Sequence, residues 1–173
     1  MKKSFVVVIV ILMAITIKAS DEIGVVVGGM NGLSYKHWFS KKIALQVDAA
    51  VGLTAAPGGI YYRGYKMQGG TNPQYDFTVN PNIAFHHPLT ENFKFYYGVG
   101  ANFGLVSDLH NVNPNLIMGK FGLNTMLGLA YYINKVSFSL DFRPGYGLAF
   151  YNSQSPHFSF FDWKIGLAIR YCL

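Results

Sequence analysis

The sequence has little of three things that hold or define many soluble domains: cysteine, charge and long apolar runs. Its single cysteine, Cys172, cannot form an internal disulfide, and no cluster of cysteine and histidine has the spacing of a zinc site. Charged residues make up 13% of the 173 residues, while 51% are hydrophobic and 16% are aromatic. This composition excludes both an ordinary cytosolic protein and an intrinsically disordered chain.

The longest apolar run is too short for a membrane-spanning helix, which needs about 20 apolar residues. It covers residues 5–17, follows the basic pair Lys2 and Lys3, and precedes the small residues Ala19 and Ser20. This layout is typical of a secretory signal peptide, so we expect residues 1–20 to be removed and residues 21–173 to form one domain. Half of the formal net charge of +6 lies in the expected signal peptide, which argues against binding to nucleic acid.

Apolar residues alternate with polar or small residues through most of the remaining chain, with the period of β-strands rather than helices. The last strand is the clearest case, because Trp163, Ile165 and Leu167 lie on one face, and Lys164, Gly166 and Ala168 on the other. The same alternation predicts strands over residues 43–53, 77–89, 93–105, 121–133, 136–150 and 162–173. The fold class is therefore predicted to be all-β.

The size of a small barrel indicates which face points outward. An eight-stranded barrel has an interior just wide enough for side chains to fill. The apolar faces of the last four strands carry no charged residue and many aromatic ones, and the side chains of these faces are too large to fit inside such a barrel together. Closed strands with outward apolar faces are stable only in lipid, so the sequence predicts an antiparallel transmembrane barrel.

The strand count is predicted from the connections. Short ones at residues 40–42, 90–92 and 134–135 alternate with longer ones near residues 55–74, 107–119 and 151–159, as in outer-membrane barrels. An exported chain starts on the periplasmic side, and a barrel whose two ends lie there has an even number of strands. We therefore divide residues 23–39 at the hairpin signal Asn31-Gly32. This division gives eight strands in an up-and-down meander. Pro81 and Pro144 inside strands predict bulges.

Four stretches give the chain a resemblance to small outer-membrane barrel proteins of the porin-like and OmpX-like families, particularly the type found in Bacteroidota. They are GLSYKHWF at residues 32–39, FYYGVG at 95–100, LDFRP at 140–144 and GLAIRY at 166–171. The resemblance implies an eight-stranded barrel in the bacterial outer membrane, inserted by the barrel-assembly machinery, which recognises the last strand. It implies no particular activity.

Nine charged residues are predicted to point into the barrel. The basic ones are Lys36, Lys94, Arg143, Lys164 and Arg170, and the acidic ones are Asp48, Asp76, Asp141 and Asp162. Because burying an unpaired charge is costly, we expect these groups to pair with one another and to fill the interior. A polar path for a solute is the alternative.

Histidines and serines offer little chemistry. His86 and His87 are adjacent in a strand, so they point to opposite faces and do not share a metal. A lipid hydrolase needs a serine, a histidine and an acid near the outer rim. Two loops hold such residues, namely Ser107, Asp108 and His110 in one and Ser155 and His157 in the other. Three polar residues in a loop are usually only solvated, so we predict no enzyme, cofactor or metal.

The second external loop is the most unusual segment. Its sequence GIYYRGYKMQ at residues 59–68 contains Tyr61, Tyr62, Arg63, Tyr65 and Lys66. Tyrosine and arginine are favoured at recognition sites, and the cations suit lipopolysaccharide phosphates, acidic glycans or another extracellular ligand. An aromatic girdle at the membrane interface is the alternative.

Together these observations predict a monomeric, non-enzymatic outer-membrane barrel with a packed interior. It is expected to contact outer-membrane lipid and to act through its external loops in surface interaction, adhesion or envelope integrity. A narrow passive pore and a lipid A or phospholipid acyl hydrolase are the alternatives.

Overall fold

The computed structural model describes residues 21–54, 61–62, 65–66, 74–107, 117–150 and 158–173 of the chain. They form the strands β1 (Asp21–Gly28), β2 (Asn31–Trp38), β3 (Ile43–Thr54), β4 (Tyr61–Tyr62), β5 (Tyr65–Lys66), β6 (Gln74–Pro88), β7 (Phe93–Ser107), β8 (Ile117–Ile133), β9 (Val136–Phe150) and β10 (Phe158–Cys172). Among the described residues, no helix is long and apolar enough to cross a membrane.

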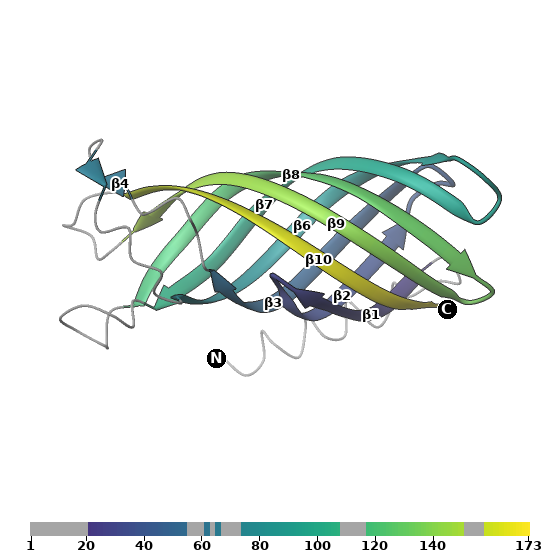
Figure 1. Cartoon of the computed structure of the whole chain (residues 1–173), viewed down its shortest axis with the longest axis horizontal. Coiled ribbons are helices and arrows are strands. Elements are labelled where there is room, and N and C mark those ends of the chain that lie inside the picture. The colour runs from purple at the N-terminus through teal and green to yellow at the C-terminus, as the bar shows by residue number, and fades with distance from the viewer. Residues whose placement is uncertain (1–20, 55–60, 63–64, 67–73, 108–116, 151–157) are drawn as a thin grey trace, which may run out of the picture.

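Eight of these strands form a closed antiparallel barrel (Figure 1). Its order is β1-β2-β3-β6-β7-β8-β9-β10, and β1 pairs with β10 to close the ring. Each strand follows its neighbour in the sequence, so the topology is a meander. The two short strands β4 and β5 form a hairpin that joins the free edge of β10 where Ser159 pairs with Tyr61. The predicted all-β barrel of eight antiparallel strands is confirmed.

The two ends of the barrel differ. Three tight turns, at residues 39–42, 89–92 and 134–135, lie at one end together with Asp21 and Leu173, and we call this the turn end. The turns have local causes: Ser40 Oγ accepts hydrogen bonds from two backbone N–H groups, and Asn134 has a positive φ of 52°. The opposite end, where β4 lies, is called the loop end (Figure 1).

Side chains alternate between the two faces of the wall, as the period of two predicts. On β8, Phe121, Leu123 and Leu127 point outward with about half of their surface exposed, whereas Gly122 and Met126 are buried inside. Large exposed apolar side chains occur on all eight barrel strands. Because an exposed apolar surface of this extent is stable only in hydrocarbon, the outward face lies against lipid.

The predicted position of the first hairpin turn is wrong by two residues. Asn31 and Gly32 belong to β2, and the turn consists of Gly29 and Met30. Gly28 adopts a φ of +116°, which is open to glycine, and the Asn31 amide side chain bonds to the backbone of Gly28 with both its oxygen and its nitrogen. Asn31 therefore stabilises the turn from the first position of β2, next to the turn residues.

The bulges predicted at Pro81 and Pro144 are also wrong. The register between β6 and β7 is the same on both sides of Pro81, and the register between β8 and β9 is the same on both sides of Pro144. Each proline interrupts the pairing on one side of its strand and leaves it continuous on the other. The fixed φ of proline is compatible with an extended strand, so the loss of its backbone N–H donor does not require the extra residue of a bulge.

Candidate functional site

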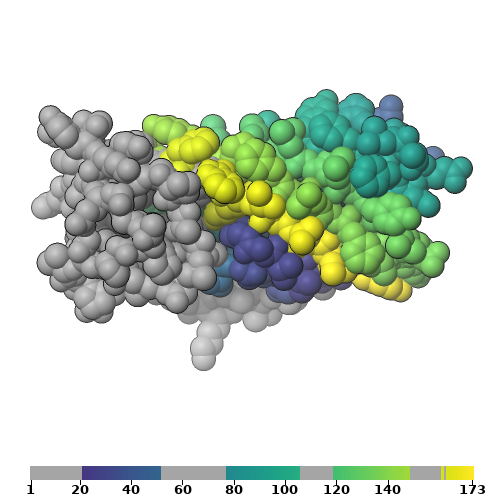
Figure 2. All heavy atoms as spheres, in the orientation of Figure 1, coloured from purple at the N-terminus to yellow at the C-terminus, as the bar shows by residue number. Residues whose placement is uncertain are grey.

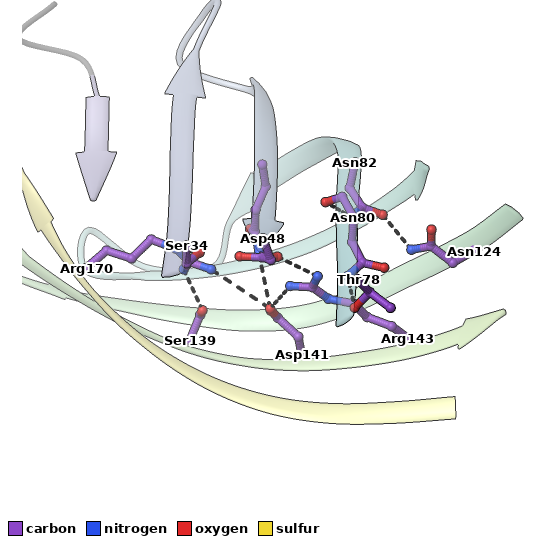
Figure 3. A network of polar contacts seen from close by, with 11 residues as sticks. Ser34, Asp48, Thr78, Asn80, Asn82, Asn124, Ser139, Asp141, Arg143 and Arg170 are labelled. Atoms are coloured by element: carbon purple, nitrogen blue, oxygen red, sulfur yellow. Dashed lines mark hydrogen bonds and ion pairs between the residues drawn. The ribbon is translucent and has the colours of Figure 1, made fainter. Parts of the chain in front are cut away.

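The centre of the barrel is occupied by an arginine held between two aspartates. Arg143 Nη1 lies 2.5 Å from Asp48 Oδ2, and Arg143 Nη2 lies 2.5 Å from Asp141 Oδ2 (Figure 3). Asp48 belongs to β3, whereas Arg143 and Asp141 belong to β9. These strands are four places apart in the closed ring of eight, so they lie opposite each other and the ion pair spans the interior.

Further polar side chains extend this central network. The Gln46 amide donates to Asp48 at 3.0 Å and to Asp141 at 3.3 Å, which is a second link between β3 and β9. Arg170 on β10 donates to Ser34 Oγ at 2.6 Å and to Ser139 Oγ at 2.8 Å (Figure 3). These side chains are almost completely buried, so they close the cross-section at this level.

A second cluster surrounds Glu22 nearer the turn end. Its carboxylate accepts hydrogen bonds from Trp38 Nε1 at 2.7 Å, from Ser137 Oγ at 2.7 Å and from Tyr132 Oη at 3.3 Å. These donors come from β2, β9 and β8, so one carboxylate on β1 links strands on both sides of the β1–β10 pair that closes the barrel. A buried carboxylate requires such partners.

The lysines of this half lie on aromatic rings. Lys94 Nζ is 4.6 Å from the centres of both the Trp38 and Tyr132 rings, and Lys36 Nζ is 5.0 Å from the centre of the Tyr96 ring. His86 stacks on Tyr96, with 4.7 Å between the ring centres. Cations over aromatic faces are favourable when they are removed from water. Charges and rings together therefore fill the turn-end half.

The loop-end half is lined differently. One step outward from Arg143, the Asn124 amide donates to Asn82 Oδ1 at 2.6 Å, which is a neutral contact. Beside Asn124, the inward position of β9 is Gly145, and one step farther outward Gly122 of β8 pairs with Gly147 of β9. Lys120 and Lys164 are buried there too.

The structure places most of the predicted interior charges inside the wall. Lys36, Asp48, Asp141, Arg143, Lys164 and Arg170 are buried, and Lys94 is half-buried. Asp76 and Asp162 lie in β6 and β10, but their side chains lie outside the described residues. Glu22 and Lys120 are buried on the inward face as well, but the predicted strands began one residue after each of them. Extending the period of two by one position would have found both.

The remaining candidates are at the two ends. The loop residues Tyr61, Tyr62, Tyr65 and Lys66 form the β4–β5 hairpin, and their side chains, like the whole of Arg63, lie outside the described residues. Ser107 ends β7, whereas Asp108, His110, Ser155 and His157 lie outside the described residues. In the part of the chain that the structure describes, no group of three or more His, Cys, Asp or Glu residues could hold a metal ion.

The closed meander, the outward apolar surface and the buried polar interior define a transmembrane β-barrel of the outer-membrane type. Comparison with solved structures finds a similar chain, Neisserial surface protein A (NspA). The TM-score is 0.57 at 12% identity, and the match covers 88% of this chain and 93% of that chain. At this identity the likeness shows the fold alone. No protein-family model and no curated protein sequence matches the chain.

Proposed function

We propose that the protein is a monomeric barrel of the bacterial outer membrane that holds its external loops for recognition at the cell surface and does not conduct solutes. The observation that carries this proposal is the Arg143 ion pair, which joins opposite strands across the interior. A passage would have to break a buried network of charges, which is costly. The alternative of a narrow pore has no comparable support.

The proposed orientation places the turn end in the periplasm and the loop end outside the cell. Tight turns at the periplasmic end and longer external connections are the pattern of outer-membrane barrels. The proposal includes removal of residues 1–20 on export and insertion by the barrel-assembly machinery, for which the predicted signal peptide and the strand β10 are the support.

The residues proposed for recognition are Tyr61, Tyr62, Arg63, Tyr65 and Lys66. They are in or beside the β4–β5 hairpin, which lies at the loop end on the edge of β10. Two cations among three tyrosines suit an anionic partner such as lipopolysaccharide phosphate or an acidic glycan, because charge-assisted bonds to phosphate and carboxylate are strong.

Binding of the refolded protein to lipopolysaccharide vesicles tests this role. We expect the double variant Arg63→Ser and Lys66→Ser to reduce binding at least tenfold, since each cation supplies a charge-assisted contact. The double variant Lys41→Ser and Lys42→Ser is the matched control, because these two lysines are exposed beside a tight turn at the opposite end. Equal loss in both variants, or no loss in either, would remove the support for a specific role of the hairpin.

A further inference from the structure

Inward-facing side chains at the turn end of the barrel are not fully buried. The inward positions nearest this end on β2, β7, β8 and β10 are Trp38, Lys94, Tyr132 and Cys172. Each of the four is partly exposed, whereas the next inward residue on each of these strands is almost completely buried. The turn-end parts of β7 in teal, β8 in green and β10 in yellow lie together at the right of Figure 2. We call these four residues the turn-end mouth, and solvent reaches them.

Two lysines lie near one indole ring at this mouth. Lys94 Nζ is 4.6 Å from the centre of the Trp38 ring, and Lys36 Nζ, from the next inward position of β2, is 5.7 Å from the same ring. The Lys36 ammonium is completely buried and has no hydrogen-bonding partner. No hydrogen bond or ion pair joins Lys94 to another described residue. Two like charges this close repel each other, and neither has an acceptor.

The count of interior charges also leaves one cation in excess. In the central network around Arg143, two carboxylates offset two guanidinium groups. Nearer the turn end, the described inward-facing side chains carry the two ammonium groups of Lys36 and Lys94 and one carboxylate, that of Glu22. The Glu22 oxygens already accept hydrogen bonds from three other side chains. Because a desolvated charge without a counterion is costly, this end of the interior favours an added negative charge.

We infer that the turn-end mouth binds a small dissolved oxyanion, such as inorganic phosphate, at the exposed side of Lys94. An ammonium group forms strong charge-assisted hydrogen bonds with such an anion. The rings of Trp38 and Tyr132 are each 4.6 Å from Lys94 Nζ, and both are held by hydrogen bonds to Glu22, so the cation is already in position. Lys36 adds a second positive charge from below, and its burial limits screening by salt.

The direction of Lys94 favours a dissolved anion over a lipid headgroup. Lys94 lies on the inward face of β7, whereas its neighbours Phe93 and Phe95 lie on the outward face, against lipid. In the proposed orientation the anion reaches the mouth from the periplasm. The inference requires neither this orientation nor recognition by the β4–β5 hairpin.

Quenching of Trp38 fluorescence by iodide tests the site. The chain has two tryptophans, so Trp163→Phe leaves Trp38 as the reporter, in nanodiscs of uncharged phosphatidylcholine. Added Lys94→Met keeps the length of the side chain and removes its charge. We expect it to lower the iodide Stern–Volmer constant at least threefold, because a nearby cation concentrates anions, and to leave quenching by neutral acrylamide unchanged. Lys41→Met is the matched control, since Lys41 is exposed in a tight turn at the same end. Equal iodide quenching with and without Lys94, or an equal decrease in both lysine variants, would overturn the inference.

Competition by phosphate is a second test, which needs no change at Lys94. In the Trp163→Phe protein, inorganic phosphate at constant ionic strength is expected to reduce iodide quenching at least twofold. Maltoside micelles, which contain no phosphate, distinguish the two sources of the anion, and quenching there should equal that in phosphatidylcholine nanodiscs. No protection by free phosphate would overturn the inference. Strong quenching in micelles that is lost in nanodiscs would overturn it as well, because a lipid headgroup would then occupy the mouth.

Discussion

The two halves of the barrel interior are filled in different ways. In the turn-end half, large buried side chains such as Arg170, Tyr96 and Lys36 reach across the lumen. In the loop-end half, three inward positions of β8 and β9 are glycines, namely Gly122, Gly145 and Gly147, although Asn124 and Lys120 of β8 are buried there as well. The difference teaches that the large inward side chains of the turn-end half, more than the shape of the wall, fill the narrow interior of an eight-stranded barrel. The turn-end half is a plug, and the loop-end half carries the β4–β5 hairpin for which we propose a role in recognition.

Removing the central cation should have the largest effect on this comparison. Arg143→Leu leaves Asp48 buried without its ion-pair partner and leaves Asp141 with Arg170 alone, 4.0 Å away, and breaking a buried pair in this way costs about 3 to 5 kcal/mol. The expected result is a large decrease in the urea midpoint of unfolding, followed by tryptophan fluorescence in lipid vesicles. An unchanged midpoint would mean that the two carboxylates do not depend on Arg143.

A smaller decrease is expected from overfilling the plug. A Cβ on Gly128 would overlap the ring of Tyr96, so Gly128→Ala should lower stability by about 1 to 3 kcal/mol through forced repacking. Gly119→Ala is the matched control on the same strand, because a Cβ there has nothing within 4 Å. If the two variants unfold at the same urea concentration, Tyr96 is not packed against the wall.

Loosening the cluster around Glu22 should cost less than removing Arg143. Trp38→Phe keeps an aromatic ring but removes the indole donor to the Glu22 carboxylate, and the loss of a hydrogen bond to a charged group is about 1.5 to 3 kcal/mol. Part of this loss is offset because Ser137 and Tyr132 still donate to the same carboxylate. Denaturant titration should therefore place this variant between the native protein and Arg143→Leu, and a larger effect than that of Arg143→Leu would reverse the order of the two clusters.

The smallest effect is expected just outside the plug. Asn124→Ala removes the neutral contact with Asn82 and should cost about 1 kcal/mol, the usual value for one hydrogen bond between uncharged groups. The measurement is again the unfolding midpoint, with Arg143→Leu in parallel. A cost as large as that of Arg143→Leu would show that both halves of the interior carry equal weight.

The sequence was sufficient for the barrel and for its faces because the period of two is set by strand geometry and is visible in residues such as Trp163, Lys164 and Ile165. Alternation says which way Asp48 and Arg143 point, but not that their strands are opposite each other, which depends on the register of the whole ring. The predicted position of the first turn was wrong because Asn31 stabilises the turn from the neighbouring strand, through its side chain, and is not itself one of the turn residues.

The central claim is that the interior is sealed by paired charges, and electrical recording from the purified protein in planar lipid bilayers tests it most directly. The native barrel is expected to give no discrete current steps, because Arg143 and Gln46 join β3 to β9 across the interior and the turn-end half beyond them is filled by charged and aromatic side chains. Regular single-channel steps from the native protein would contradict the claim and favour a pore.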